Sequence, residues 1–245
     1  MDYRVYRLSF KEILGYGFLY LVMYLIFAKL FYDSFLVAAI GILWLPVLFR
    51  MKAQELMKKR KEQLALEFKE FITALSASLK TGYSAENALS QAHKDMICMY
   101  GEESFMSKEC LYIEKQLLNN KPLEVLLAEF AERSGEEEIR DFAAVFLIAK
   151  RSGGNMANII RNTTDIIGEK MDVKREIQLL YAAKRMEQSI MNIVPLAMIA
   201  FVRITTPGYF DVMYGNPFGI LVMTICLVVY AGAFFLARNI IDIEV

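Results

Sequence analysis

The sequence is poor in the residues on which most catalytic and metal sites depend. It has one histidine, His93, and three cysteines, at positions 98, 110 and 226. A single histidine cannot build a histidine metal site or a Ser–His–Asp array. The cysteines form no CxxC pair and no even set, which argues against a disulfide scaffold and a structural zinc site. We therefore expect no bound metal, and we interpret His93 as a surface residue.

An excess of charge of one sign is also missing. Lys and Arg total 28, Asp and Glu total 28, and the formal net charge is zero. A general nucleic-acid binder needs a basic surface, so we expect no nucleic-acid partner. The Gly-x-x-x-x-Gly-Lys sequence that cradles nucleotide phosphates does not occur either. These absences argue against a nucleotide site and against histidine-based catalysis, and we expect no cofactor.

Hydrophobic residues, in contrast, make up 56% of the chain, against about 45–50% in ordinary soluble domains. Near the N-terminus, two stretches of 16 residues, Ile13–Ala28 and Ser34–Phe49, carry no charge. A membrane span needs about 20 mostly apolar residues, and snorkelling of Lys29 extends the first stretch. We predict a membrane hairpin in residues 1–49, with spans at about 13–30 and 34–49. A signal peptide is disfavoured, because a second span follows at once and no small-residue cleavage site intervenes.

A second apolar block lies near the C-terminus. Residues 212–237 are uncharged over 26 positions, and residues 188–202 are uncharged as well. We predict a membrane hairpin in residues 188–245, with spans at about 188–206 and 217–237. Pro195 is predicted to kink the first of these spans. Charged residues, which mark transport paths inside membranes, are missing from the interiors of all four predicted spans, which disfavours a transporter or channel.

Basic residues are distributed unevenly around the predicted spans. Only Lys29 and Arg203 fall in the two predicted outer turns, and the other 26 lie on the opposite side. Cytoplasmic loops carry an excess of Lys and Arg. We therefore predict a multi-pass membrane protein whose N-terminus, middle region and C-terminus are cytoplasmic.

The middle region, residues 50–187, has the apolar periodicity of packed helices. The first apolar series is Leu64, Phe68, Phe71, Ile72, Leu75 and Leu79. Turn chemistry separates the helices: Gly82 suits a left-handed helix end and Ser84 a following cap, and Gly153–Gly154 with Asn155 suits a second such break. The predicted fold class is therefore all-α, with two N-terminal and two C-terminal transmembrane helices around a cytoplasmic bundle of about six helices.

Charge is unevenly distributed within the middle region. Residues 95–141 carry a net charge of −7, whereas 50–69 and 150–185 carry +4 each. The basic stretches flank the spans, where anionic lipid headgroups attract them. A helix over residues 50–80 would be about 45 Å long, so the acidic hairpins are expected at a tip presented to the cytosol. Ordinary solvated helix faces explain the same split, and this alternative stays open.

Several segments together resemble one protein family. Residues 71–84 (FITALSASLKTGYS) with Ala88–Leu89 resemble a first helix pair and its Gly-x-Ser turn, and residues 152–156 (SGGNM) resemble a Gly-Gly turn before a long return helix. Pro195, residues 206–209 (TPGY) and the closing residues 238–245 (RNIIDIEV) complete the set. The family is that of the type II secretion system F-domain (GspF-like) proteins. Within it, the similarity is greatest to the TadB subfamily, with TadC as the alternative.

The resemblance implies a non-enzymatic platform in the bacterial inner membrane, at the base of a Tad or type IV-like pilus or of a type II-like secretion machine. Its implied partners are a secretion-type hexameric ATPase, a second F-domain platform protein, pilin subunits and the lipid membrane, within a homo- or hetero-oligomer. Larger members carry two F domains, whereas this chain has room for one. With the charge split, the resemblance suggests that acidic residues contact the motor. The candidates are Glu102, Glu103, Glu136, Glu137 and Glu138.

Other classes of function fit the sequence less well. An exporter subunit would require buried polar residues in its spans, and a membrane-anchored signalling scaffold would require an output domain. A lipid-modifying enzyme would require His, Asp or Glu clustered at the membrane face. The first two remain as alternatives to the platform.

Overall fold

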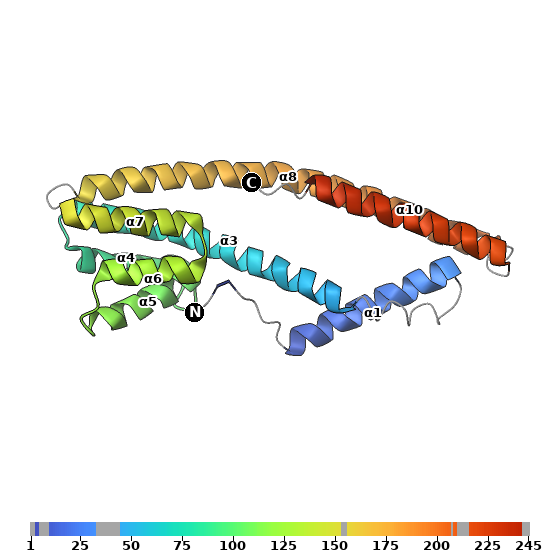
Figure 1. The fold of residues 1–245 in the computed structure, drawn as a ribbon, viewed down its shortest axis with the longest axis horizontal. Coiled ribbons are helices and arrows are strands. Elements are labelled where there is room, and N and C mark those ends of the chain that lie inside the picture. Colours follow the sequence, from blue (N-terminus) through green and yellow to red (C-terminus); the bar gives the residue numbers. More distant parts are fainter. Residues whose placement is uncertain are drawn as a thin grey trace. The chain divides into compact units, whose positions relative to one another are not determined.

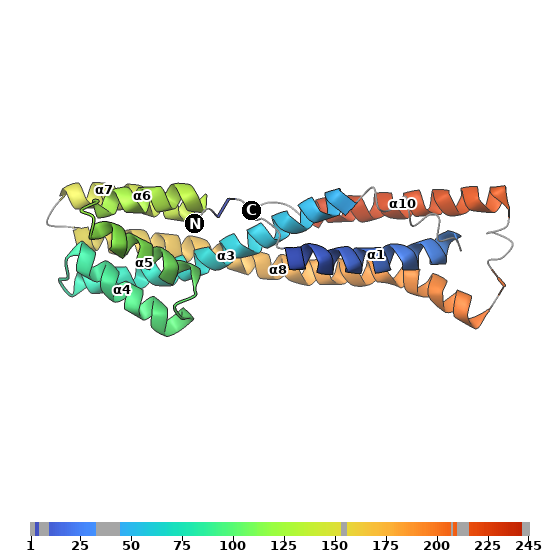
Figure 2. The ribbon, with the colours of Figure 1, turned by 90° about the horizontal axis from the view of Figure 1, so that it is seen from below.

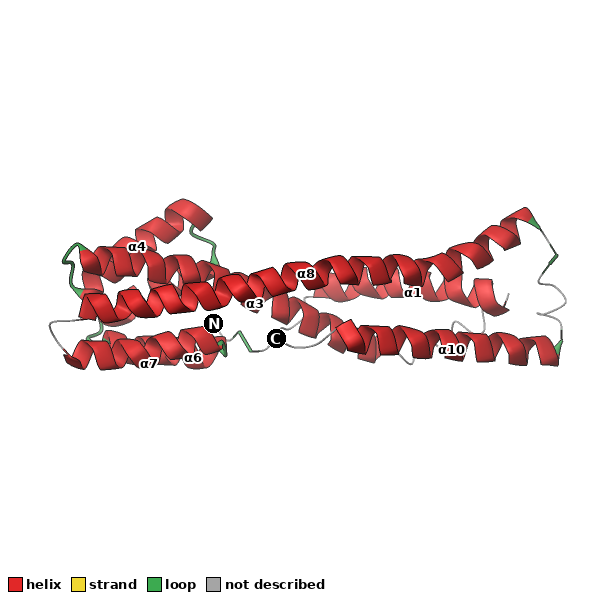
Figure 3. Ribbon diagram, turned by 90° about the horizontal axis from the view of Figure 1, so that it is seen from above, coloured by secondary structure: helices red, strands yellow, loops and turns green. Residues whose placement is uncertain are grey.

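A computed structural model of the chain describes residues 3–4, 10–32, 45–152, 156–206, 208–209 and 216–241 (Figure 1). These residues form eight α-helices and no strand (Figure 3), which confirms the all-α fold class. The chain divides into two compact units. One comprises Met1–Arg7 and Met51–Val173, and we call it the helical unit. The other comprises Leu8–Arg50 and Lys174–Val245, and we call it the apolar unit.

The helical unit is a bundle of mostly antiparallel helices (Figure 2). Within the described residues it includes the larger part of α3 and the start of α8, with four shorter helices between them. α4 packs against α5, α5 against α6, and α6 against α7. The bounds are α3 (Leu45–Lys80), α4 (Ala85–Tyr100), α5 (Phe105–Leu117), α6 (Leu123–Ser134), α7 (Glu137–Ser152) and α8 (Met156–Thr205). This agrees with the predicted bundle of about six helices.

Local turn chemistry explains where these helices end. Gly82 has φ +93°, which an L side chain rarely adopts, and it follows directly on the end of α3. The Ser84 hydroxyl accepts a hydrogen bond from the backbone N–H of Asn87, so it caps the start of α4. Gly135, with φ +67°, closes α6 in the left-handed conformation. The remaining turn residues from the sequence, Gly153, Gly154 and Asn155, lie outside the described residues.

Aromatic residues fill the centre of the helical unit. The ring of Phe68 on α3 lies edge-on to that of Phe142 on α7, with centroids 5.6 Å apart, and 6.2 Å from that of Phe130 on α6. All three are fully buried, as is every other member of the first apolar series except Leu79, which is nearly so. Edge-to-face pairs of this kind add to the free energy gained from burial itself. The aromatic cluster therefore ties α3, α6 and α7 together.

The apolar unit contains α1 (Phe10–Tyr32), α10 (Pro217–Ile241) and parts of α3 and α8. α8 is long and apolar enough to cross a membrane, and the residues of its most apolar 18-residue stretch are not buried. A shorter apolar stretch, Phe218–Phe234, lies in α10. The guanidinium of Arg203 donates a hydrogen bond to the carbonyl of Lys29, so two residues from the predicted outer turns meet.

The predicted spans differ in how much of each the structure describes. Of the predicted span at 34–49, residues 34–44 lie outside the described residues. Pro195 lies inside α8, which continues on both sides of it. The hydroxyl of Tyr230 on α10 donates a hydrogen bond of 2.6 Å to the carbonyl of Asn192, one turn before this proline. Pro195 has no backbone N–H to donate within the helix, and the Tyr230 hydroxyl supplies a donor to a backbone oxygen close to that position.

Candidate functional site

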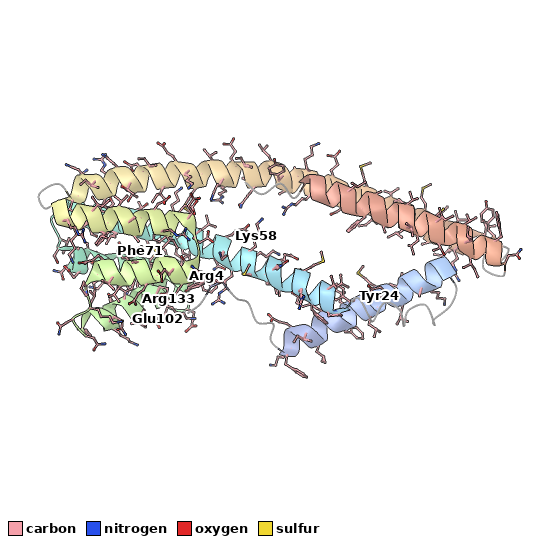
Figure 4. All side chains as sticks on the ribbon, in the orientation of Figure 1. Arg4, Tyr24, Lys58, Phe71, Glu102 and Arg133 are labelled. Carbon is pink, nitrogen blue, oxygen red and sulfur yellow. The ribbon has the colours of Figure 1, made fainter. Side chains whose placement is uncertain are left out.

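The five acidic candidates lie in two turns at one end of the helical unit. Lys61 on α3 donates hydrogen bonds to the Glu136 carboxylate, at 3.1 Å, and to the Gly135 carbonyl, at 3.3 Å. Six residues further along α3, the Glu67 carboxylate accepts a hydrogen bond of 2.8 Å from the backbone N–H of Met106, at the start of α5. The turn from α4 to α5 and the turn from α6 to α7 therefore both flank this stretch of α3 (Figure 4).

This position differs from the expected acidic tip. Gly82, just beyond the end of α3, is 21 residues from Lys61, which corresponds to about 30 Å of helix. At that other end, Lys150 brings together Glu86 and Glu124, which follow the turns at the starts of α4 and α6. The acidic turns are thus at the end where α3 enters the bundle, and the expectation of a tip beyond the end of α3 is wrong.

Three of the five candidates are exposed to solvent. The side chain of Glu103 is 92% exposed and lies 2.6 Å from the ammonium of Lys108, whose hydrogen bond lowers the pKa of the Glu103 carboxyl. Glu102 is exposed beside it. Glu137, at the start of α7, is 65% exposed and lies 3.2 Å from Lys170. These carboxylates are accessible to a partner.

The other two candidates hold helices of the bundle together. Glu136 is 21% exposed and pairs with Lys61, which links the start of α7 to α3. Glu138 is only 3% exposed and lies 3.8 Å from the ammonium of Lys170 on α8. Reversing either charge would break an internal ion pair, so neither tests a partner contact cleanly.

A second polar cluster, at the same end of the bundle, has a buried tyrosine at its centre. The side chain of Tyr3 is fully buried, and its hydroxyl donates a hydrogen bond of 3.1 Å to the Glu109 carboxylate on α5. That carboxylate is 2.7 Å from the guanidinium of Arg133 on α6. The backbone N–H of Tyr3 donates to the Arg133 carbonyl, at 3.1 Å. Burial, and then the negative charge of Glu109, raise the pKa of the Tyr3 phenol.

Two further side chains enclose the Tyr3 ring. The ring of Phe105 on α5 meets it edge-on, with centroids 6.0 Å apart. The guanidinium of Arg60 on α3 lies 4.9 Å from its centroid, in cation–π geometry. We call Arg60, Phe105, Glu109 and Arg133 the Tyr3 seat. Because its members come from three helices, the seat exists only in the folded bundle.

The seat was not predicted from the sequence, although α5 carries a signal for it. Glu109 lies three residues after Met106 and four before Ile113, so it falls within an apolar helical stripe. A carboxylate in such a position predicts a buried acid with a partner. The position of Tyr3 has no such signal, because its contact with Glu109 spans 106 residues.

The interpretation of His93 as a surface residue is wrong. It is 7% exposed, and its Nδ1 lies 2.8 Å from the carboxylate of Glu114 on α5. The reason is its register, since His93 follows Leu89 by four residues and precedes Met96 by three, on the buried face of α4. Among the described residues, no group of three or more His, Cys, Asp and Glu side chains is placed to hold a metal ion.

The fold and its exposed surfaces define a class of protein. The chain combines a helical bundle with helices whose apolar side chains are unburied. This combination is characteristic of a helical membrane protein with a water-facing domain. A model of the family described as type II secretion system (T2SS), protein F, matches residues 71–203, more than half of the chain. The chain belongs to this family, whose members are inner-membrane platform proteins of secretion and pilus-type machines and are generally not enzymes. Comparison with curated proteins found no match, and comparison with solved structures found none.

Proposed function

We propose that this chain is the non-enzymatic platform of a Tad or type IV-like pilus or of a type II-like secretion machine, where it couples a hexameric assembly ATPase to the insertion of pilin subunits. The family match over residues 71–203 carries this proposal, because it includes most of the helical bundle and most of α8. Assignment to the TadB subfamily, with a TadC-like second F-domain protein as partner, is part of the proposal.

The proposed topology places residues 50–187 in the cytoplasm between membrane hairpins at 1–49 and 188–245. The distribution of Lys and Arg supports it. Two structural observations agree: Tyr3 packs within the helical unit, and Arg203 meets Lys29 within the apolar unit. The first supports a start of the chain on the same side of the membrane as the bundle. The second brings together the ends of α1 and α8 that the topology assigns to the outer face.

The proposed motor contact is the exposed acidic pair Glu102 and Glu103, with Glu137 as a further candidate. Complementary charge speeds association and aligns partners, and exposed carboxylates keep that role without disturbing the fold. An ATPase surface that accepts them would present Lys or Arg. The contact should weaken as salt rises, because charges at the rim of an interface are screened.

The test is co-purification of the ATPase with tagged full-length chain from mildly solubilised membranes. The variant with Glu102→Lys and Glu103→Lys should retain several-fold less ATPase than the native chain. A matched control reverses Asp165 and Glu169, two exposed acidic residues on α8, and should retain the native amount. Unchanged recovery from the first variant would overturn the contact. Recovery of transport or signalling proteins in place of the ATPase and a second F-domain protein would overturn the function.

A further inference from the structure

Tyr3 occupies its position on the helical unit in the way a bound ligand would. Three helices provide the contacts to Tyr3, through Arg60 of α3, Phe105 and Glu109 of α5, and Arg133 of α6. We propose that the Tyr3 seat is a binding site for a peptide segment that carries a tyrosine, and that the N-terminal segment of this chain is its resident ligand. The inference goes beyond the proposed function and does not rest on it.

Each part of the tyrosine meets a different group. The carbonyl of Arg133, in the last turn of α6 where helix carbonyls have no intrahelical partner, accepts a hydrogen bond from the backbone N–H. The edge-on ring of Phe105 and the cation of Arg60 contact the aromatic ring. The Glu109 carboxylate accepts a hydrogen bond from the hydroxyl. Backbone, ring and hydroxyl are therefore recognised separately, which distinguishes tyrosine from other residues.

The hydroxyl contact should dominate the selectivity. The carboxylate of Glu109 is 2% exposed, so water cannot readily replace a lost donor. A phenylalanine in the seat would fill the same apolar space and leave that oxygen with one donor fewer. Arg133 continues to neutralise the carboxylate when the tyrosine leaves, at a distance of 2.7 Å. The seat can therefore be emptied without leaving a buried charge unpaired.

The seat adjoins the turn from α6 to α7. A Cβ placed on Gly135 would lie 3.3 Å from the side chain of Arg4 and 3.2 Å from the ammonium of Lys61. The residue after Tyr3 thus packs beside the turn that carries Glu136. The segment that carries Tyr3 and this turn therefore lie side by side.

The test measures binding of a fluorescent peptide that copies residues 1–5, in which Tyr3 is the one tyrosine, to full-length chains in detergent, by fluorescence anisotropy. Peptide binding should be strongest for the Tyr3→Ala chain, intermediate for Tyr3→Phe and weakest for the native chain, whose own tyrosine fills the seat. A peptide with phenylalanine in place of Tyr3 should bind the Tyr3→Ala chain about tenfold more weakly or worse, the expected effect of losing a hydrogen bond to a buried charge.

Two controls separate the seat from general effects. Tyr83→Phe alters an exposed tyrosine of the helical unit and should leave peptide uptake at the native level. In a chain with both Tyr3→Ala and Glu109→Gln, the preference for the tyrosine peptide over the phenylalanine peptide should largely disappear. Circular dichroism checks helix content, and if Tyr3→Ala unfolds, the comparison of Tyr3→Phe with the native chain carries the test. Equal affinity for both peptides, or no uptake by either folded variant, would overturn the proposal.

Discussion

At the scale of single residues, Gly135 combines a conformational and a packing requirement. Its φ of +67° is strained for an L side chain, and a Cβ would press on Lys61 and Arg4. We expect Gly135→Ala to lower the free energy of unfolding by about 1–3 kcal/mol, and more than Gly82→Ala does. Gly82 has a similar φ of +93°, but a Cβ added there would meet no atom within 4 Å, so it isolates the conformational cost.

The two glycine variants would be compared by denaturant unfolding in detergent, with the helical circular dichroism signal as the measure of the folded fraction. Equal losses would mean that the contacts with Lys61 and Arg4 add nothing to the conformational cost. A larger loss for Gly82→Ala would contradict the packing argument altogether.

At the scale of elements, Lys150 joins α7 to α6 and α4. Its ammonium lies 2.7 Å from the Glu124 carboxylate and 3.7 Å from that of Glu86. The hydrogen bond from Lys150 lowers the pKa of Glu124. A carboxyl with a lowered pKa in the folded state stabilises the protein above its unfolded-state pKa. That stabilisation is lost as the pH falls through the lowered value.

Glu124→Gln should therefore destabilise the chain at pH 7, by less than about 1 kcal/mol because the pair is partly solvated. The difference should shrink as the pH falls through the lowered pKa of Glu124, where the native carboxyl also becomes neutral. Thermal melts of both proteins at pH 7 and pH 3.5 would measure it, with Glu132→Gln, an exposed change on the same helix, as the control. A deficit that persists undiminished at pH 3.5 would rule out the charge as its cause.

At the scale of the whole molecule, the three cysteines can report the proposed topology. Cys98 is exposed on the helical unit, Cys110 is buried, and Cys226 lies in α10. Burial raises the pKa of the Cys110 thiol well above its ordinary value, so that thiol should stay unreactive while the bundle is folded. A membrane-impermeant maleimide should then label Cys98 from the cytoplasmic side, and lipid should shield Cys226.

Mass spectrometry of labelled inverted vesicles and intact spheroplasts would locate the modified cysteine. Labelling of Cys98 in inverted vesicles alone is the expected result, and Cys98→Ser should abolish it. Labelling of Cys98 in intact spheroplasts would place the helical unit on the outer face and refute the topology.

Periodicity predicted the helices and their buried faces because these depend on residues three and four apart. The series from Leu64 to Leu79 and the turns at Gly82 and Ser84 are local in this sense. Successive helices of the bundle are antiparallel, so the turns lie alternately at its two ends. Because α4 runs back along α3, Glu102 lies at the end where α3 enters the bundle. The number of turns between α3 and Glu102 therefore predicts its position better than its distance along the sequence did.

The Tyr3 seat could not be predicted as a whole, since it combines residues from the N-terminus, α3, α5 and α6. Glu109 could have been recognised as a buried acid from the apolar stripe around it. Its two partners, Tyr3 and Arg133, have no such pattern, because long-range pairing leaves no periodic trace in either segment.

The aromatic cluster around Phe68 also has a spectroscopic consequence. Rings held edge-on at 5.6 Å, as those of Phe68 and Phe142 are, produce strong ring currents in the space between the helices. Methyl groups buried in the same core, such as those of Leu64 and Ile72, should be shifted from their usual NMR positions, upfield over a ring face and downfield at a ring edge. Such dispersed methyl signals would report the native packing of α3, α6 and α7 within a detergent micelle, where the bulk helix signal cannot distinguish one helix from another.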